Sequence, residues 1–160
     1  MLTIRRLETR EEIETCAKMM ANSEPWITLG RDYEASLATL SVPTKEIYVG
    51  WMAEEVAGFM ILNMQGAFVG YIQTMCISPA WRGKGLGSKM MAYAEGRILK
   101  DTPNVFICVS SFNHGAKRFY ARLGYEEIGE LKDYIVPGHS EILLRKTIAP
   151  LSGFTAERPE

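Results

Sequence analysis

The chain has 160 residues, 47% hydrophobic and 23% charged, a composition ordinary for a globular domain that can bury a core. Its net charge of -1 and pI of about 6.2 exclude a global field that would attract nucleic acid or an anionic membrane. Three widely separated cysteines without a CxxC pair argue against a disulfide framework or a zinc site. We therefore expect a cytoplasmic protein with no bound metal, and no membrane span, because no apolar run approaches about 20 residues.

The first third of the chain predicts one strand followed by two helices. Residues 2–7 alternate well enough for a strand. Thr9 and Glu12 have the spacing of a capping box, so a helix should begin after Thr9. Pro25 should end that helix, because proline disfavours helical geometry at the residue before it, and Pro43 should close a second short helix.

The rest of the chain predicts a sheet with further helices. Residues 45–78 contain three β-rich runs that indicate an antiparallel meander, and apolar side chains on both faces predict helices on both sides. After a glycine-rich turn we expect a helix to about residue 100, a strand at 104–111, a helix from Asn113 to Gly124, and strands near 125–131 and 141–148. The fold class is therefore α/β, with a mixed, mostly antiparallel sheet of about seven strands flanked by about four helices. Residues 1–148 should form a single domain and residues 149–160 a loosely ordered tail.

The glycine turn has the sequence RGKGLGS at residues 82–88, between an apolar strand and a helix. Glycine allows positive φ angles and a close approach of a ligand to the backbone. At the start of a helix, N–H groups point outward at the positive end of the helix dipole, where phosphate commonly binds. Arg82 and Lys84 add positive charge and Ser88 offers a hydroxyl. The alternative is a tight strand-to-helix turn with solvated cations.

Two common phosphate-binding motifs do not fit this turn. A Walker loop needs GxxxxGK[ST], and no glycine stands five residues before a Gly-Lys-Ser/Thr here. A dinucleotide fingerprint needs GxGxxG, whereas this turn reads GxGxG. A nucleotide-binding protein is therefore a disfavoured reading.

A third motif does fit, and it is supported by a second one downstream. Arg82, Gly85 and Gly87 match the pattern [QR]-x-x-G-x-[GA] after a strand that ends in CISPAW. Residues 110–130 read SSFNHGAKRFYARLGYEEIGE, with an Asn that opens a helix ending in FYxxLGY. The chain thus resembles the GNAT family of N-acetyltransferases over residues 2–148, and looks closest to its branch of ribosomal-protein alanine (protein N-terminal) acetyltransferases.

The resemblance implies acetyl-CoA as co-substrate and a GNAT-type sheet whose fourth and fifth strands splay around the pantetheine arm. The expected cofactor-binding residues are Met75, Cys76, Ile77, Arg82, Gly83, Lys84, Gly85, Leu86, Gly87, Ser88 and Asn113. The backbone of Met75–Ile77 would hold pantetheine, and residues 83–88 would hold the pyrophosphate. Asn113 can equally be a plain helix N-cap, and both roles are compatible.

Tyr120 matches the family tyrosine near the thioester sulfur, and it is the one expected catalytic residue. When an amine displaces CoA a thiolate leaves, and a nearby O–H group can protonate it. A tyrosine keeps its proton at neutral pH because its reference pKa is about 10. The alternative is a core role, because Tyr120 lies on the apolar face of its helix.

The general base is unassigned by the sequence. Relatives that acetylate protein N-termini commonly carry a glutamate five residues before the Asn, where this chain has Cys108. Gln73 stands where other members place a glutamate on the fourth strand, and Glu34, Glu46 and Asp133 could act only through a water. Cys108 as a nucleophile lacks a partner histidine, which favours a packed strand cysteine.

For the acceptor, Trp26 and Tyr134 are large amphipathic residues in expected loops, where each can contact a substrate or cover the core. The resemblance implies transfer of acetyl to a primary amine of a small molecule or of a peptide or protein N-terminus, by direct attack in a ternary complex. No nucleic-acid or membrane partner is expected, and a homodimer stays open. The rival reading is a catalytically silent acyl-CoA-binding sensor.

Overall fold

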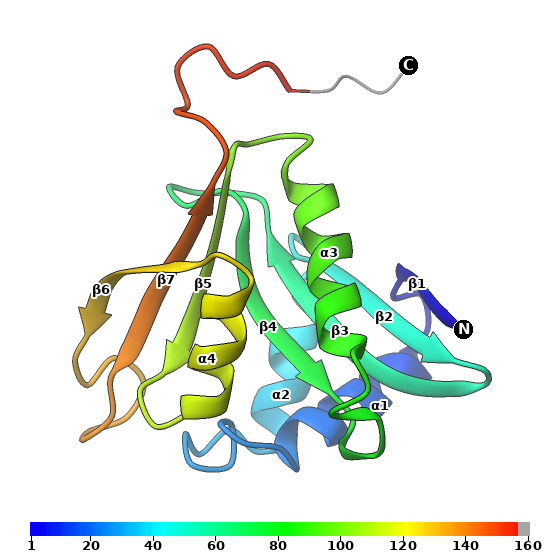
Figure 1. Ribbon diagram of the computed structural model, residues 1–160. Helices are drawn as coiled ribbons and strands as arrows, with labels where there is room; N and C mark the ends of the chain where they lie inside the picture. The colour runs from blue at the N-terminus through cyan, green and yellow to red at the C-terminus, as the bar shows by residue number, and fades with distance from the viewer. Residues whose placement is uncertain (157–160) are drawn as a thin grey trace. The chain divides into compact units, whose positions relative to one another are not determined.

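The computed structural model describes residues 1–156, and its elements follow the expected order. This range contains seven β-strands, four α-helices and one short 3-10 helix (Figure 1). In chain order they are β1 (Leu2–Arg6), α1 (Arg10–Ala21), α2 (Tyr33–Leu40), β2 (Glu46–Met52), β3 (Glu55–Asn63), β4 (Tyr71–Ile77), η1 (Pro79–Trp81), α3 (Leu86–Ile98), β5 (Asn104–Ser110), α4 (His114–Arg122), β6 (Glu126–Leu131) and β7 (Glu141–Thr147).

The strands form one sheet in the order β1-β2-β3-β4-β5-β7-β6. Pairing is antiparallel between β1 and β2, β2 and β3, β5 and β7, and β7 and β6. Strands β4 and β5 run parallel, with Tyr71 opposite Phe106 and Ile72 opposite Ile107. The predicted α/β class with a mixed, mostly antiparallel sheet is confirmed.

The chain divides into two compact units. The first unit comprises Met1–Asn63 and Gln73–Tyr93, and the second comprises Met64–Ile72 and the chain from Ala94 onward. The first therefore holds β1, β2, β3, α1, α2, most of β4 and the N-terminal part of α3. The second holds the start of β4, the end of α3, and β5, α4, β6 and β7. The expectation of a single domain over residues 1–148 stays a prediction.

In the first unit, side chains pack against both faces of β2 and β3, with α1 and α2 on one face (Figure 1). On that face lies a core of buried side chains: Cys16, Ala17, Met20, Leu40, Ile47, Val49, Phe59, Ile61 and Cys76. On the other face Tyr93 of α3 packs edge-on against Tyr48, with ring centroids 5.2 Å apart. A Cβ at Gly58 would lie 2.7 Å from the Cys76 carbonyl oxygen, so only glycine lets β4 approach β3 this closely.

The helix ends follow the local signals in the sequence. Thr9 begins α1 with the predicted capping box, in which its side chain accepts from the Glu12 N–H and the Glu12 side chain accepts from the Thr9 N–H. In the second unit Gly124 has a φ of 93°, which ends α4 in the left-handed conformation common at helix C-termini. Both helix ends therefore lie where the local sequence predicted them.

Residues 149–156 contain no strand or helix, and residues 157–160 lie outside the described residues, so the loosely ordered tail stays a prediction. None of the helices in residues 1–156 combines the length and apolar character that crossing a bilayer requires. The same range contains no cluster of three His, Cys, Asp or Glu side chains that could hold a metal ion.

Candidate active site

The glycine turn lies in the first unit, where β4 ends and α3 begins. Ser78 anchors the end of β4 by donating its N–H to the Ala57 carbonyl at 2.8 Å. The chain then passes through η1 into a turn at residues 82–85, in which Gly83 and Gly85 have φ angles of 71° and 79°. These angles are costly for residues with a Cβ, which explains why glycine occupies both positions.

The first N–H groups of α3 form no hydrogen bond within residues 1–156. The first helical hydrogen bond runs from Lys89 N–H to the Gly85 carbonyl at 3.3 Å. The N–H groups of Leu86, Gly87 and Ser88 therefore have no acceptor among residues 1–156. Gly83, Lys84, Gly85 and Ser88 are exposed, so an anion can approach the backbone here.

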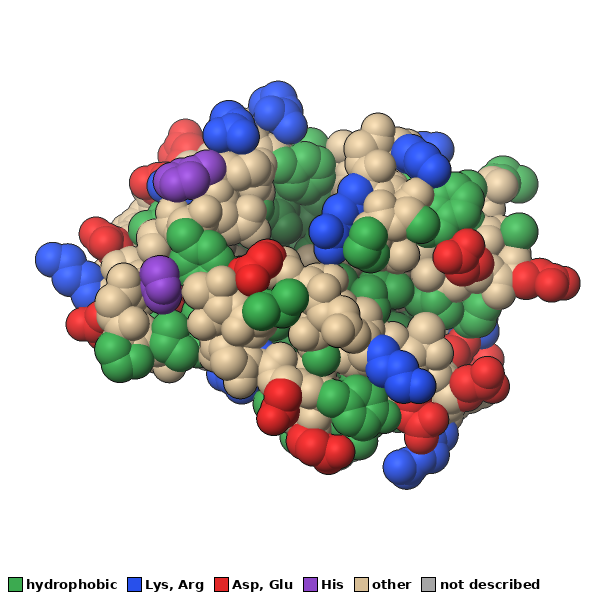
Figure 2. All heavy atoms as spheres, turned by 90° about the horizontal axis from the view of Figure 1, so that it is seen from below, with side chains coloured by type: hydrophobic (Ala, Val, Ile, Leu, Met, Phe, Trp, Pro, Cys, Tyr) green, Lys and Arg blue, Asp and Glu red, His purple; other side chains and the backbone are tan. Residues whose placement is uncertain are grey.

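The two cations of the turn differ in what holds them. Arg82 donates from Nε to the Ile77 carbonyl at 3.0 Å and from a terminal nitrogen to Ser23 Oγ at 3.2 Å, so it ties the turn to β4 and to the end of α1. Lys84 places its ammonium 4.8 Å from the centre of the Trp81 ring. Figure 2 shows that acidic and basic side chains both occur on the face drawn there.

Along the strand before the turn, side chains alternate between buried and partly exposed positions. Cys76 is buried in the core of the first unit, and burial raises the pKa of its thiol to about 12. Met75 and Ile77 flank it and are partly exposed on the opposite face of β4. The Ile77 carbonyl is already occupied by Arg82.

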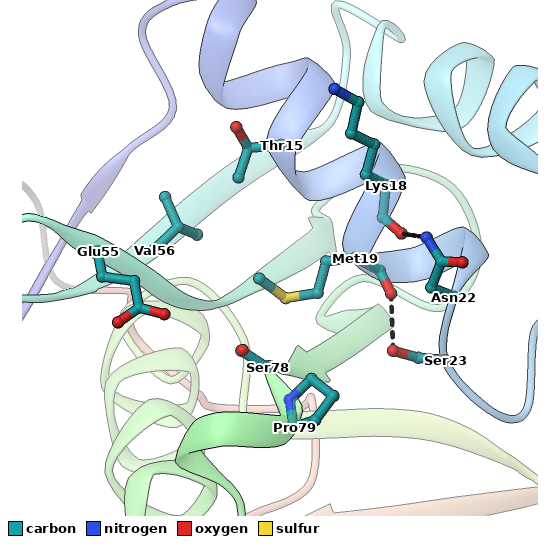
Figure 3. Close-up of a pocket in the computed structure, with 9 residues that line it drawn as sticks. All are labelled: Thr15, Lys18, Met19, Asn22, Ser23, Glu55, Val56, Ser78 and Pro79. Carbon is teal, nitrogen blue, oxygen red and sulfur yellow. Dashed lines mark hydrogen bonds between the residues drawn. The ribbon is translucent and has the colours of Figure 1, made fainter.

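A pocket of about 360 Å³ adjoins the turn within the first unit (Figure 3). It is lined by Thr15, Lys18, Met19, Asn22, Ser23, Glu55, Val56, Ser78 and Pro79. Asn22 and Ser23 donate their side-chain hydrogens to the carbonyls of Lys18 and Met19, at 2.8 Å and 2.7 Å. Two of its polar side chains are therefore used to complete α1, and none of the expected cofactor-binding residues lines it.

In the second unit, Asn113 and Tyr120 lie at the start and near the end of α4. Asn113 is the N-cap, because its Oδ1 accepts from the Ala116 N–H at 3.2 Å. Its side-chain amide nitrogen donates no hydrogen bond among the described residues, so the expected donor role is compatible with the cap.

Tyr120 is 7% exposed, and its hydroxyl has no hydrogen-bond partner within residues 1–156. Its ring packs edge-on against Phe119 and Tyr125, with centroid separations of 5.0 Å and 5.8 Å. Burial raises the pKa of Tyr120, so the hydroxyl stays protonated at neutral pH. The side chain is thus both a core residue and an uncommitted proton donor.

The two expected acceptor residues differ in exposure. Trp26 in the first unit is half-buried and packs against the core of that unit, which favours the covering role. Tyr134 in the second unit is 64% exposed, in the connection between β6 and β7. Tyr134 is therefore the better placed of the two to contact a substrate.

Sequence reasoning missed one carboxylate. Glu46 accepts from the Tyr48 hydroxyl at 2.9 Å and pairs with Arg6, while Asp133 accepts from the Gly138 N–H at 2.7 Å. Glu141, at the start of β7, is 5% exposed and accepts from Ser110 Oγ at 2.6 Å. Its position beside β5 is set by strand pairing, and no local motif in the sequence indicates it.

Residues 6–125 match the model of the acetyltransferase (GNAT) family. Because this match covers most of the chain, the protein belongs to the GNAT family of acetyltransferases, as its two motifs predicted. It is similar to the blasticidin-S acetyltransferase of Streptomyces morookaense, with 30% identity over 94 residues, which are 59% of this chain and 68% of the relative.

Two solved structures show the same fold. The ribosomal-protein-S18-alanine N-acetyltransferase of Escherichia coli has a TM-score of 0.72 at 17% identity, with 97% of this chain and 100% of that chain covered. An aminoglycoside 6'-N-acetyltransferase complexed with coenzyme A has a TM-score of 0.76 at 15% identity, with 99% of each chain covered. At these identities the likeness is one of fold.

Proposed function

We propose that the protein transfers the acetyl group of acetyl-CoA to a primary amine of a small molecule or of a peptide or protein N-terminus. The observation that carries this proposal is the set of N–H groups at Leu86–Ser88 that have no acceptor in residues 1–156, next to an exposed turn in which Gly83 and Gly85 take positive φ. Such groups at a helix N-terminus suit the two negative charges of a pyrophosphate. Because the chain belongs to the GNAT family, we expect this pyrophosphate to be that of CoA.

Each expected cofactor residue then has a physical task. Gly83 to Ser88 hold the pyrophosphate with backbone N–H groups, and Lys84 adds charge. Arg82 keeps the turn in place through Ile77 and Ser23. The backbone of Met75–Ile77 holds the pantetheine arm, and the Asn113 amide donates to it.

The reaction proposed is direct attack by the amine on the acetyl carbon. As the new C–N bond forms, the C–S bond breaks and CoA leaves as a thiolate. Tyr120 donates its proton to that thiolate, because its hydroxyl is protonated at neutral pH and has no other hydrogen-bond partner in residues 1–156. Burial also raises the pKa of Cys108, which keeps this thiol protonated and disfavours an acyl-cysteine intermediate.

The acceptor is an amine whose surroundings include Tyr134. The relatives named for blasticidin S, for an aminoglycoside and for the alanine of a ribosomal protein all have amine acceptors by name. We therefore place a primary amine, of a small molecule or of a peptide N-terminus, in the acceptor role, with Tyr134 contacting it, and assign Trp26 to covering the core of the first unit.

Two measurements test this proposal. A thermal-shift assay with CoA, acetyl-CoA, ATP and NAD should give a large increase in melting temperature with CoA and acetyl-CoA only. Release of the CoA thiol should then be measured with blasticidin S, an aminoglycoside and an alanyl peptide. A shift with ATP alone would overturn the cofactor assignment. Binding of CoA without thiol release for any amine would favour the silent sensor.

A further inference from the structure

Glu141 is a buried carboxylate with no cationic partner. It is 5% exposed, and no lysine, arginine or histidine in residues 1–156 forms an ion pair with it. Its Oε1 accepts from Ser110 Oγ, which faces it across the β5–β7 pairing. Its Oε2 accepts no hydrogen bond and is not among the fully enclosed polar atoms, so it keeps some contact with solvent.

Glu12 shows how the same chain stabilises a buried carboxylate that serves structure. Glu12 is also 5% exposed, but it pairs with Arg5 and accepts from the backbone N–H groups of Glu8 and Thr9, at 2.7 Å and 3.1 Å. Burial raises the pKa of Glu12, and these partners more than offset it, so the net pKa is lowered. For Glu141 burial is the larger effect and the Ser110 hydrogen bond the smaller, so its pKa is raised.

The groups that face Glu141 come from neighbouring segments of the second unit. Tyr71 from β4, Cys108 from β5 and Tyr134 from the β6–β7 connection are near enough to interact with one another or with Glu141 electrostatically. Burial raises the pKa of both Tyr71 and Cys108, so neither ionises in the acid range. Glu141 is therefore the group in this cluster that ionises first as the pH rises, with a pKa that burial holds above the usual value for a carboxyl group.

The location of the cluster connects it to the proposed reaction. Cys108 follows Ile107, which pairs with Ile72 where β4 and β5 run side by side, and family resemblance puts pantetheine between these strands. Glu141 on β7 interacts electrostatically with Cys108, so its carboxylate lies close to this part of β5.

We propose that Glu141 is the general base that accepts a proton from the ammonium group of the acceptor. This inference rests on the proposed acetyltransferase function. An ammonium must lose two protons to become an amide nitrogen. One passes to Glu141 Oε2, directly or through one water, and is then released to solvent. The other restores the proton that Tyr120 gives to the departing thiolate. The products are therefore the acetylated amine, CoA thiol and one free proton.

The test compares Glu141→Gln with wild type, using acetyl-CoA and the amine with the highest turnover in the acceptor panel. Glutamine keeps the shape and can still accept from Ser110, but it cannot take a proton. Its turnover at pH 7 should fall at least ~100-fold, the low end of a general-base contribution, while CoA affinity stays unchanged. Glu130→Gln, on exposed β6, is the matched control and should retain wild-type turnover.

A pH profile separates proton transfer from a structural role. In wild type, kcat/KM should rise as the pH passes through the raised pKa of Glu141. This rise should be absent in Glu141→Gln. Ser110→Ala removes the hydrogen bond that lowers this pKa, so its rise should move to higher pH. If Glu141→Gln keeps wild-type turnover, or if the rising part of the pH profile stays at the same pH in Ser110→Ala, Glu141 is not the base. Either result would leave the acetyltransferase proposal standing. Absence of turnover in wild type would overturn the acetyltransferase proposal and this one with it.

Discussion

The glycine turn at residues 82–88 and the carboxylate of Glu141 are prepared for their proposed tasks in opposite ways. The turn is exposed and offers backbone N–H groups that nothing else in the described chain uses. Glu141 is buried, and its side chain is held by one hydroxyl with no cation beside it. Binding an anion favours donors that solvent and ligand can both reach, whereas proton transfer near neutral pH favours a carboxylate kept largely from water. The comparison indicates that the two proposed tasks, binding the cofactor and activating the acceptor, depend on different local environments.

Among the variants considered, Tyr120→Phe should reduce turnover the most after Glu141→Gln. The substitution removes only the hydroxyl and keeps the ring that packs on Phe119 and Tyr125. Turnover should fall at least ~10-fold while CoA affinity changes little, because the hydroxyl acts on the departing thiolate. Turnover is measured as the release of CoA thiol, and CoA affinity is measured by titration. Tyr93→Phe serves as control, and unchanged turnover in Tyr120→Phe would remove this residue from the mechanism.

Gly85→Ala tests the turn itself. No atom lies within 4 Å of the added Cβ, so the φ of 79° is the source of strain, at about 1–2 kcal/mol. If the turn relaxes to avoid that strain, affinity for CoA should fall about tenfold. Gly96→Ala, at an exposed position of α3, is the matched control and should raise stability by roughly 0.5–1 kcal/mol. Equal CoA affinity in both variants, measured by calorimetry, would contradict an anion site at this turn.

Glu141→Gln should increase stability at neutral pH while it abolishes activity. The folded pKa of Glu141 is raised above its unfolded value, so its protonated form favours the folded state, and that contribution is lost as pH rises through the folded pKa. Glutamine does not ionise, so the variant does not lose stability in this way as the pH rises. Its melting temperature should therefore exceed that of wild type at pH 7 and approach it below the unfolded carboxyl pKa of about 4.3. A lower melting temperature than wild type at pH 7 would indicate a structural role instead.

Cys108→Ser should have the smallest effect. The substitution keeps the size of the side chain and removes the sulfur nucleophile, so most of the turnover should remain. Mass spectrometry of wild type after incubation with acetyl-CoA should show no acetyl adduct on Cys108. An adduct that disappears on addition of amine would replace the ternary-complex reaction with a two-step one.

Much of the fold and the glycine turn could be predicted because their signals are local. The Thr9–Glu12 capping box, the RGKGLGS turn and the Asn113 cap each involve residues a few positions apart, and the structure has them where the sequence predicted. Local steric and hydrogen-bond preferences decide such features before distant parts of the chain meet.

The environment of Glu141 and the anchoring of the turn were decided by tertiary structure. Ser110 and Glu141 are 31 residues apart, and Arg82 and Ser23 are 59 apart, so strand pairing and packing bring them together. Whether a carboxylate has a cation beside it cannot be read from its neighbours in sequence, as Glu12 and Glu141 show. The sequence alone determined the family, the order of elements and the position of the glycine turn that we propose binds an anion. Only the folded chain decided which carboxylate is buried without a partner, because burial and pKa depend on what packs around a group in space.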